Sequence, residues 1–222
     1  MLHSMEAATG HQVSPPPQDR AATRAFFAAR AAGWEDRYPD DGPAFAAAVA
    51  ALGPPSGGVV LDAACGSGRA LPFLRTAVGD AGTVLGLDIT PEMLEEATRR
   101  GRRSLASLVL GDVDRLPLPD ASIDAVLGAG LLPHLGDPAS GLCELARVTR
   151  AGGRLGLFHP IGRVALAARH GRSPSSDDVR AEAAIRHLLR DTGWDTDLVD
   201  DGQDRYLVIA TRQRGVLRRP PD

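Results

Sequence analysis

The chain has 222 residues, a formal net charge of −3 at pH 7, and a composition that is 43% hydrophobic and 24% charged. This length suits one domain with a core of ordinary size. The slightly negative charge argues against nucleic acid or an anionic membrane as partner, because both attract strongly basic surfaces.

The two cysteines, Cys65 and Cys143, are far apart in the chain and form no C-x-x-C pair. The histidines do not cluster with them at ligand spacings, so no metal site is predicted. No segment is long and apolar enough to span a bilayer, and the N-terminus lacks the order of a signal peptide. We therefore expect a soluble cytoplasmic protein, either a monomer or a homodimer.

The first 57 residues predict helices and no sheet strand. Residues 1–18 contain three consecutive prolines and few apolar side chains, which predicts a disordered leader. Helices are expected at 19–32 and 43–52, joined by a loop rich in aromatic and acidic residues, and Gly53-Pro54-Pro55 ends the second. We expect residues 19–57 to form a helical lid over a ligand cleft.

Residues 58–71, GVVLDAACGSGRAL, are the most informative segment of the chain. An apolar run ends in Asp62, and the small residues Ala64, Gly66 and Gly68 precede a predicted helix. Small residues let the backbone turn sharply and let a ligand approach the main chain. The N-terminus of the following helix offers unpaired N–H groups to an anionic ligand group.

A second apolar run, 83–88, ends in Asp88, an acid placed to accept hydrogen bonds from ribose hydroxyls. Together the two segments indicate a nucleoside cofactor on an α/β sheet. Nicotinamide and flavin sites favour G-x-G-x-x-G, but Arg69-Ala70-Leu71 follow Gly68, so the third glycine is missing. A nicotinamide oxidoreductase is therefore disfavoured.

The rest of the chain predicts an α/β sheet. Strands are expected near 58–63, 83–88, 105–110, 123–129 and 153–158, and helices near 68–78, 91–101 and 138–148. Strands that alternate with crossover helices form a parallel sheet, with ligands at the carboxyl ends of the strands. A helix at 177–192 precedes two strands, 194–201 and 204–212, whose short connection makes them antiparallel. The domain should span 58–213, with a tail at 214–222.

These segments, in this order, resemble class I S-adenosylmethionine-dependent methyltransferases over about residues 59–158. The closest resemblance is to the small type-11 methyltransferase subgroup, which includes quinone-biosynthesis and natural-product enzymes. DAACGSG, 62–68, is similar to the first motif D-x-G-x-G-x-G, with Ala64 at the first glycine. The resemblance implies a doubly wound, Rossmann-like sheet of seven strands in the order 3-2-1-4-5-7-6, with strand 7 antiparallel. It also implies S-adenosylmethionine as cofactor and S-adenosylhomocysteine as product.

The resemblance further implies cofactor-binding residues at the ends of four strands. They are Asp62, Ala64, Gly66 and Gly68; Asp88, Ile89 and Met93; Asp112 and Val113; and Ala129. Asp62 is expected to order the loop and contact the amino group of the methionine part, and Asp112 to read the adenine edge. Ile89 and Met93 are also compatible with core positions, and Asp112 with a solvated turn. Tyr38 resembles a tyrosine that closes over the cofactor in some relatives, or else anchors the loop.

His134 is the main candidate for a catalytic base, because it follows the fourth strand, where the acceptor site opens in this family. Its ordinary pKa of about 6.5 suits the task. A structural role, with the ring hydrogen-bonded to the loop backbone, is the reading we favour. His159, at the end of the fifth strand, is a second candidate. Pro133 and Ala151 depart from the family, since many relatives have histidine and proline there, and the first departure weakens a catalytic assignment.

The leading prediction is a methyltransferase for a small-molecule acceptor, with O-, N- and C-methylation all open. A cofactor-binding protein without transfer activity, acting as a sensor or partner subunit, is the main alternative. It is favoured slightly by the short segment between the fifth and sixth strands, 160–181, because relatives often build the acceptor lid there. The nicotinamide oxidoreductase is the third reading.

Overall fold

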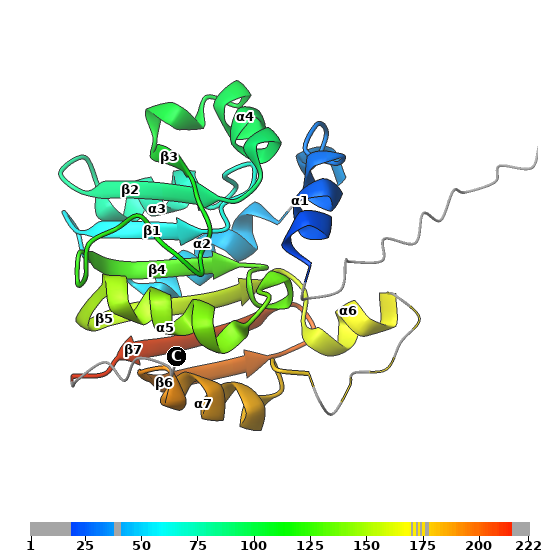
Figure 1. Ribbon diagram of the computed structural model, residues 1–222, viewed down its shortest axis with the longest axis vertical. Helices are drawn as coiled ribbons and strands as arrows, with labels where there is room; N and C mark the ends of the chain where they lie inside the picture. The colour runs from blue at the N-terminus through cyan, green and yellow to red at the C-terminus, as the bar shows by residue number, and fades with distance from the viewer. Residues whose placement is uncertain are drawn as a thin grey trace, which may run out of the picture.

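The computed structural model describes residues 19–37, 41–169, 171, 173, 175 and 178–214. They form one seven-stranded sheet with helices on both faces (Figure 1). The strands are β1 (Val59–Ala63), β2 (Thr83–Asp88), β3 (Ser107–Leu110), β4 (Ile123–Ala129), β5 (Thr149–His159), β6 (Trp194–Asp201) and β7 (Tyr206–Arg212). The helices are α1 (Arg20–Ala28), α2 (Gly42–Leu52), α3 (Leu71–Val78), α4 (Pro91–Arg99), α5 (Pro138–Val148), α6 (Arg163–Arg169) and α7 (Glu182–Asp191). Three short 3-10 helices are η1 (Glu35–Arg37), η2 (Arg102–Ser104) and η3 (Leu132–His134).

The strand order is β3-β2-β1-β4-β5-β7-β6, so the predicted topology is confirmed. Strands β1 to β5 run parallel, and β7 is antiparallel to both β5 and β6. The order reverses between β1 and β4, and this switch point is where open α/β sheets bind ligands. The carboxyl ends of the five parallel strands meet at one edge of the sheet.

Several predicted boundaries differ from the observed ones for local reasons. Helix α3 begins at Leu71 instead of 68, because Gly66 and Gly68 have left-handed φ values of +53° and +84° that an α-helix does not accept. Strand β3 begins at Ser107 instead of 105, because η2 occupies 102–104. Strand β5 already begins at Thr149, which pairs with Ile123. Helix α6, in the segment 160–181, was not predicted.

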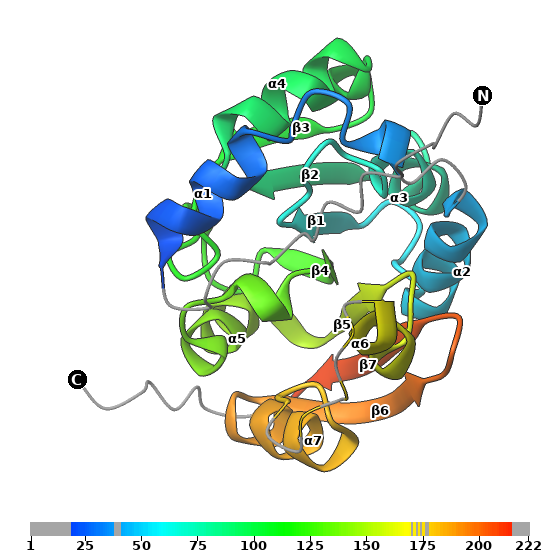
Figure 2. The same ribbon diagram turned by 90° about the vertical axis from the view of Figure 1, so that its right-hand side faces the viewer.

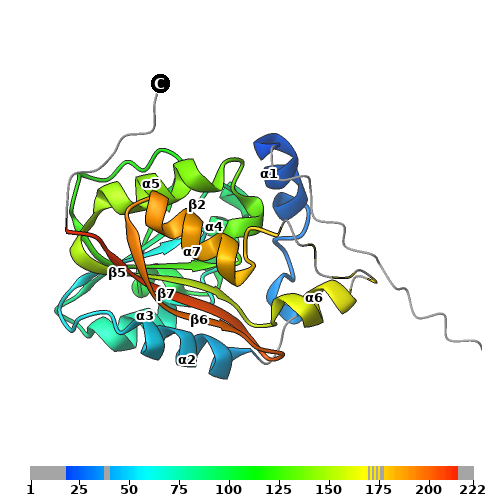
Figure 3. The ribbon, with the colours of Figure 1, turned by 90° about the horizontal axis from the view of Figure 1, so that it is seen from below.

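The two faces of the sheet have separate apolar cores. One core holds residues of α2 and α3, including Phe45, Leu52 and Leu74, and the other holds residues of α5 and α7, including Leu142 and Ile185. Figure 3 shows α2 and α3 on one side of the sheet and α5 and α7 on the other. Each fully buried side chain of this size stabilises the fold by about 1.5–3 kcal/mol relative to an exposed one.

The two predicted N-terminal helices have different surroundings. Helix α2 packs on the sheet through Phe45, Ala48, Val49 and Leu52, all buried, and so forms part of the domain core. Helix α1 lies across the edge where the parallel strands end (Figure 2). We refer to residues 19–37, which include α1 and η1, as the strap. The predicted leader, residues 1–18, and most of the predicted tail lie outside the described residues.

Within the described ranges, no helix combines the length and hydropathy needed to cross a bilayer. In the same ranges, no group of three or more His, Cys, Asp or Glu side chains is placed to hold a metal ion.

Candidate functional site

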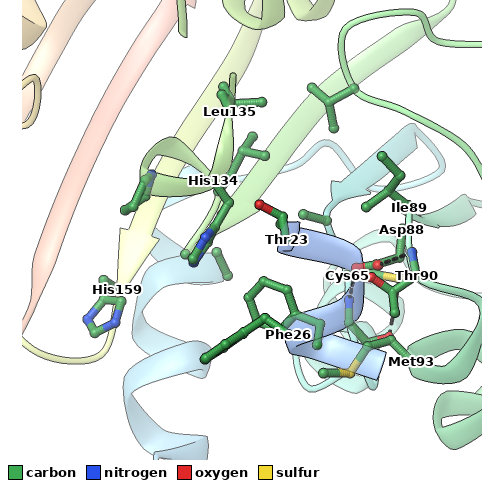
Figure 4. Close-up of a pocket in the computed structure, with 18 of the residues that line it drawn as sticks. Thr23, Phe26, Cys65, Asp88, Ile89, Thr90, Met93, His134, Leu135 and His159 are labelled. Atoms are coloured by element: carbon green, nitrogen blue, oxygen red, sulfur yellow. Dashed lines mark hydrogen bonds between the residues drawn. The ribbon is translucent and has the colours of Figure 1, made fainter. Parts of the chain in front are cut away.

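A cavity of about 870 Å3 lies at the carboxyl ends of the parallel strands. Its floor comes from the loops after β1, β2, β3, β4 and β5, and its cover comes from the strap, α6, Ser173, Ser175, Asp178 and Arg180. This volume is near the upper end of the range of about 300–1,000 Å3 for small-molecule sites. In Figure 4, Asp88, Ile89 and Met93 lie on one side of the cavity and His134 and His159 on the other.

The loop after β1 forms the wall next to Asp88. Ala64, Gly66 and Gly68 all have left-handed φ values, of +62°, +53° and +84°. A Cβ added at Gly66 would lie 4.0 Å from Met93 Sδ, on the cavity wall. A Cβ at Gly68 would lie 2.7 Å from Leu71 Cδ1, so this glycine is required by packing inside the loop, and it does not line the cavity.

Asp62, at the carboxyl end of β1, is a buried carboxyl with an unused oxygen. Asp62 is 1% exposed and lines the cavity, and its Oδ1 has no hydrogen-bond partner among the described residues. Burial, and next the charge of Asp88, raise the pKa of Asp62 to about 8. A buried acceptor without a donor is costly, and it points to a ligand that supplies one.

Asp88 has a structural task as well as a ligand-facing position. Its Oδ2 accepts the N–H of Gly66 and its Oδ1 accepts the N–H of Thr90, both at 2.8 Å. Thr90 stands at the N-cap of α4, but its side chain makes no capping bond, so Asp88 fastens the start of this helix. Burial raises the pKa of Asp88, although these N–H groups oppose the shift. A carboxylate oxygen can accept more than one hydrogen bond, so these contacts do not prevent Asp88 from binding a ligand hydroxyl.

The residues predicted at the adenine end also line the cavity. Ile89, Met93, Val113 and Ala129 contribute apolar side chains, and Met93 is almost fully buried. Asp112 also lines the cavity, but both of its carboxylate oxygens already have partners in the protein. Its Oδ1 accepts a hydrogen bond from the N–H of Asp114, and its Oδ2 lies 3.2 Å from Arg20 Nε of the strap. Tyr38 lies outside the described residues.

The two candidate catalytic histidines lie together at the opposite end. Burial first, and next His159 and Arg180, lower the pKa of His134 to about 4. Its Nδ1 has no hydrogen-bond partner among the described residues, and its ring packs on Phe27 with centroids 4.9 Å apart. The sequence favours a ring that is hydrogen-bonded to the loop backbone. At Nδ1 of His134, no such bond is formed within the described part of the chain.

His159 contacts the backbone of the loop that follows β5. Its Nδ1 lies 2.9 Å from Ile161 O and 3.2 Å from Ile161 N. Burial is the main cause that lowers the pKa of His159, and the charges of Arg180 and Arg169 lower it further. With both pKa values lowered, His134 and His159 are neutral at pH 7.

The strap is held to the loop after β1, here called the cofactor loop, by an acidic residue that the sequence analysis did not single out. Glu35 of η1 accepts a hydrogen bond of 2.7 Å from Ser67 Oγ and forms ion pairs with Arg102 at 2.9 Å and Arg100 at 3.3 Å. Arg100 and Arg102 follow α4 in the chain, and their side chains are only 26% and 14% exposed. The acidic loop after Trp34 is the complementary sequence signal.

Three more ion pairs connect the N-terminal segment to the site. Arg20 pairs with Asp112 and Asp114 after β3, and Arg69 of the cofactor loop pairs with Asp41. Arg20 begins α1, so its ion pairs hold this helix across the cavity, and Asp41, outside the strap, holds the start of α2 to the same site.

Comparisons with known proteins agree with this geometry. Residues 61–157 match the profile of the family described as Methyltransferase domain. Over 114 residues the chain is 36% identical to the aklanonic acid methyltransferase DauC of Streptomyces sp. (strain C5), a match that covers 50% of this chain and 51% of that protein. Over 112 residues it is 38% identical to the demethylmenaquinone methyltransferase of Tropheryma whipplei (strain Twist), covering 49% and 44%. The chain thus spans about half the length of these curated relatives.

Solved structures share the fold over most of their length. Magnesium protoporphyrin IX methyltransferase from Synechocystis PCC 6803, with bound S-adenosylhomocysteine, has a TM-score of 0.67 at 20% identity and covers 88% of this chain and 100% of its own. An S-adenosylmethionine-dependent methyltransferase from Aquifex aeolicus has a TM-score of 0.67 at 23% identity, covering 83% and 98%. The matched segment and the sheet order together show that residues 61–157 belong to the class I S-adenosylmethionine-dependent methyltransferases.

Proposed function

We propose that this protein is a methyltransferase that uses S-adenosylmethionine to methylate a small-molecule acceptor. The observation that carries the proposal is Asp62, a buried carboxyl with an unpartnered oxygen, next to Asp88 on the same cavity wall. The cofactor carries an ammonium group, which would supply a donor to Asp62, and ribose hydroxyls, which would supply donors to Asp88. The residues at this end therefore fit the cofactor.

Each predicted role follows from a position on the cavity wall. Asp62 would hold the ammonium group and Asp88 the ribose, while Ile89, Met93 and Val113 would flank the adenine. When bound, the cofactor supplies the sulfonium methyl group, so the protein needs no covalent nucleophile. Its side chains position the two reactants and exclude water, and positioning can contribute about 7–11 kcal/mol.

Transfer activity is favoured over a purely binding role by the far end of the cavity. The segment between β5 and β6 contributes Leu166, Ala167 and Arg169 of α6 to the lining, so it extends the cavity beyond the residues that would hold the cofactor. A protein that only senses the cofactor needs no such second compartment. The similarity to methyltransferases of aklanonic acid and demethylmenaquinone supports a small-molecule acceptor.

The proposal is tested by incubating the protein with S-adenosylmethionine and a panel of quinols, phenols, amines and carboxylic acids. We expect S-adenosylhomocysteine to form with at least one class, and Asp88→Ala to slow its formation. Tight binding of S-adenosylhomocysteine without turnover across the panel would favour the sensor reading instead.

Glu35→Gln tests whether the strap must open for ligand exchange. The change removes the charge that pairs with Arg100 and Arg102, and the two partly buried pairs together contribute about 1 kcal/mol. We expect S-adenosylhomocysteine to dissociate about fivefold faster in stopped-flow measurements. Asp36→Asn is the matched control, because Asp36 is 78% exposed and lies 3.6 Å from Arg100. Equal dissociation rates for Glu35→Gln and wild type would show that Glu35 does not hold the strap.

His134→Ala tests the role of the buried histidine. Moving a proton from a phenol of pKa about 10 to a base of pKa about 4 is uphill by about 8 kcal/mol. We therefore expect less than about a tenfold loss in kcat and a cofactor affinity within about threefold of wild type. A hundredfold or greater loss that is partly restored at higher pH would instead identify His134 as a general base.

A further inference from the structure

The cavity is electrically divided. The end lined by Asp62, Asp88, Asp112 and Asp114 is acidic, which suits a cationic cofactor. The opposite end has a different set of side chains, which includes His134, His159, Arg169 and Arg180. Figure 4 shows the two histidines at this end, away from Asp88 and Met93.

The charge at the histidine end is positive among the described residues. Arg163 and Arg180 are balanced by Asp178 and Asp201, with which they form ion pairs. Arg169 of α6 lines the cavity and adds one further positive charge.

The histidines do not add to this charge, because both are neutral at pH 7. Burial is the main cause of their lowered pKa values, and the charges of Arg180 and Arg169 add to it at His159. The unbalanced positive charge that an anionic ligand group would meet at this end is therefore that of Arg169.

Aromatic side chains of the strap form the cover between the two ends. The chain is only 4% aromatic, yet Phe26, Phe27 and Trp34 all line this cavity. Their rings form an edge-to-face series, with centroids 5.2 Å apart for Phe26 and Phe27 and 5.5 Å for Phe27 and Trp34. Such a surface is apolar and presents both ring faces and ring edges to a ligand, and aromatic pairs of this kind stabilise contacts beyond simple burial.

We propose that the methyl acceptor is a mostly apolar molecule that carries an anionic oxygen group at pH 7, either a carboxylate or an ionised enol. Arg169 determines this specificity, and Phe26, Phe27 and Trp34 contact the apolar part of the acceptor. This inference rests on the proposed function, because it assigns the end of the cavity that the cofactor would leave free.

The test uses three probes of nearly equal shape and different charge. They are 1-naphthoate, its neutral analogue 1-naphthamide, and the cationic 1-naphthamidine, each titrated by calorimetry into protein saturated with S-adenosylhomocysteine. We expect 1-naphthoate to bind at least tenfold more tightly than 1-naphthamide, and 1-naphthamidine to bind most weakly. The ionised enol 2-hydroxy-1,4-naphthoquinone, in a fourth titration, distinguishes enol from carboxylate recognition.

Variants then test the assigned residue. Arg169→Gln should remove at least about fivefold of the preference for 1-naphthoate over 1-naphthamide, while leaving the affinity for S-adenosylhomocysteine unchanged. Arg24→Gln is the matched control, because Arg24 is an exposed strap residue that does not line the cavity. Equal binding of the naphthoate and the amide, or binding of no probe to the saturated protein, would overturn the inference. Failure to bind S-adenosylhomocysteine at all would instead refute the proposed function.

Discussion

Asp62→Asn is expected to stabilise the ligand-free protein and to weaken cofactor binding. The folded-state pKa of Asp62 is raised to about 8, against about 3.9 in an unfolded chain. Between these values the folded state keeps a proton that the unfolded state has released, so stability falls as the pH rises toward 8. Asparagine has no such proton, and the variant escapes this loss.

The difference in melting temperature between the variant and wild type should therefore be small at pH 4 and grow toward pH 8. Even one pKa unit is worth about 1.4 kcal/mol, or about 3 °C for a chain of this size. Binding of S-adenosylhomocysteine should weaken about tenfold or more, because the ammonium group loses a charged partner. Asp204→Asn, an exposed site away from the cavity, is the control. A variant that is less stable than wild type at pH 8 and binds normally would contradict this role for Asp62.

Gly66→Val is expected to abolish cofactor binding. The added Cβ would enter the cavity wall near Met93, and the two methyl groups would extend further into the space next to Asp88. Binding of S-adenosylhomocysteine should weaken by at least about a hundredfold by calorimetry, or about 2.7 kcal/mol.

Gly53→Val is the control that distinguishes a blocked cofactor cavity from strain in the backbone. Gly66 has φ +53° and Gly53, the C-cap of α2, has φ +61°. Both valine variants should lose about 1–2 kcal/mol of stability from the left-handed backbone. Only Gly66→Val should lose binding, and normal binding by it would show that the loop does not contact the cofactor.

The sheet could be predicted from the sequence because its signals are local. Apolar runs that end in Asp62 and Asp88 mark strand ends, and parallel strands bring their carboxyl ends to one edge of the sheet. Nine of the predicted cofactor residues line the cavity for this reason: Asp62, Ala64, Gly66, Asp88, Ile89, Met93, Asp112, Val113 and Ala129. Gly68 is the informative exception, since a motif shows that glycine is required but not whether ligand or packing requires it.

What could not be predicted depends on contacts between distant segments. Glu35 reaches Ser67 and Arg102 across more than thirty residues of chain, and Arg20 reaches Asp114 across 94. The same holds for His134, whose lowered pKa comes from burial and from groups on other elements. No pattern along the chain gives these distances, so the sequence left a base at His134 open where the structure places a buried ring of low pKa.

The most direct test of the central claim is calorimetric titration of the full chain with S-adenosylhomocysteine, with NADH as comparison ligand. The account predicts one binding site for S-adenosylhomocysteine, with a dissociation constant between about 1 μM and 1 mM, and no binding of NADH at the same concentrations. Absence of S-adenosylhomocysteine binding by the folded protein, or tighter binding of NADH, would contradict it.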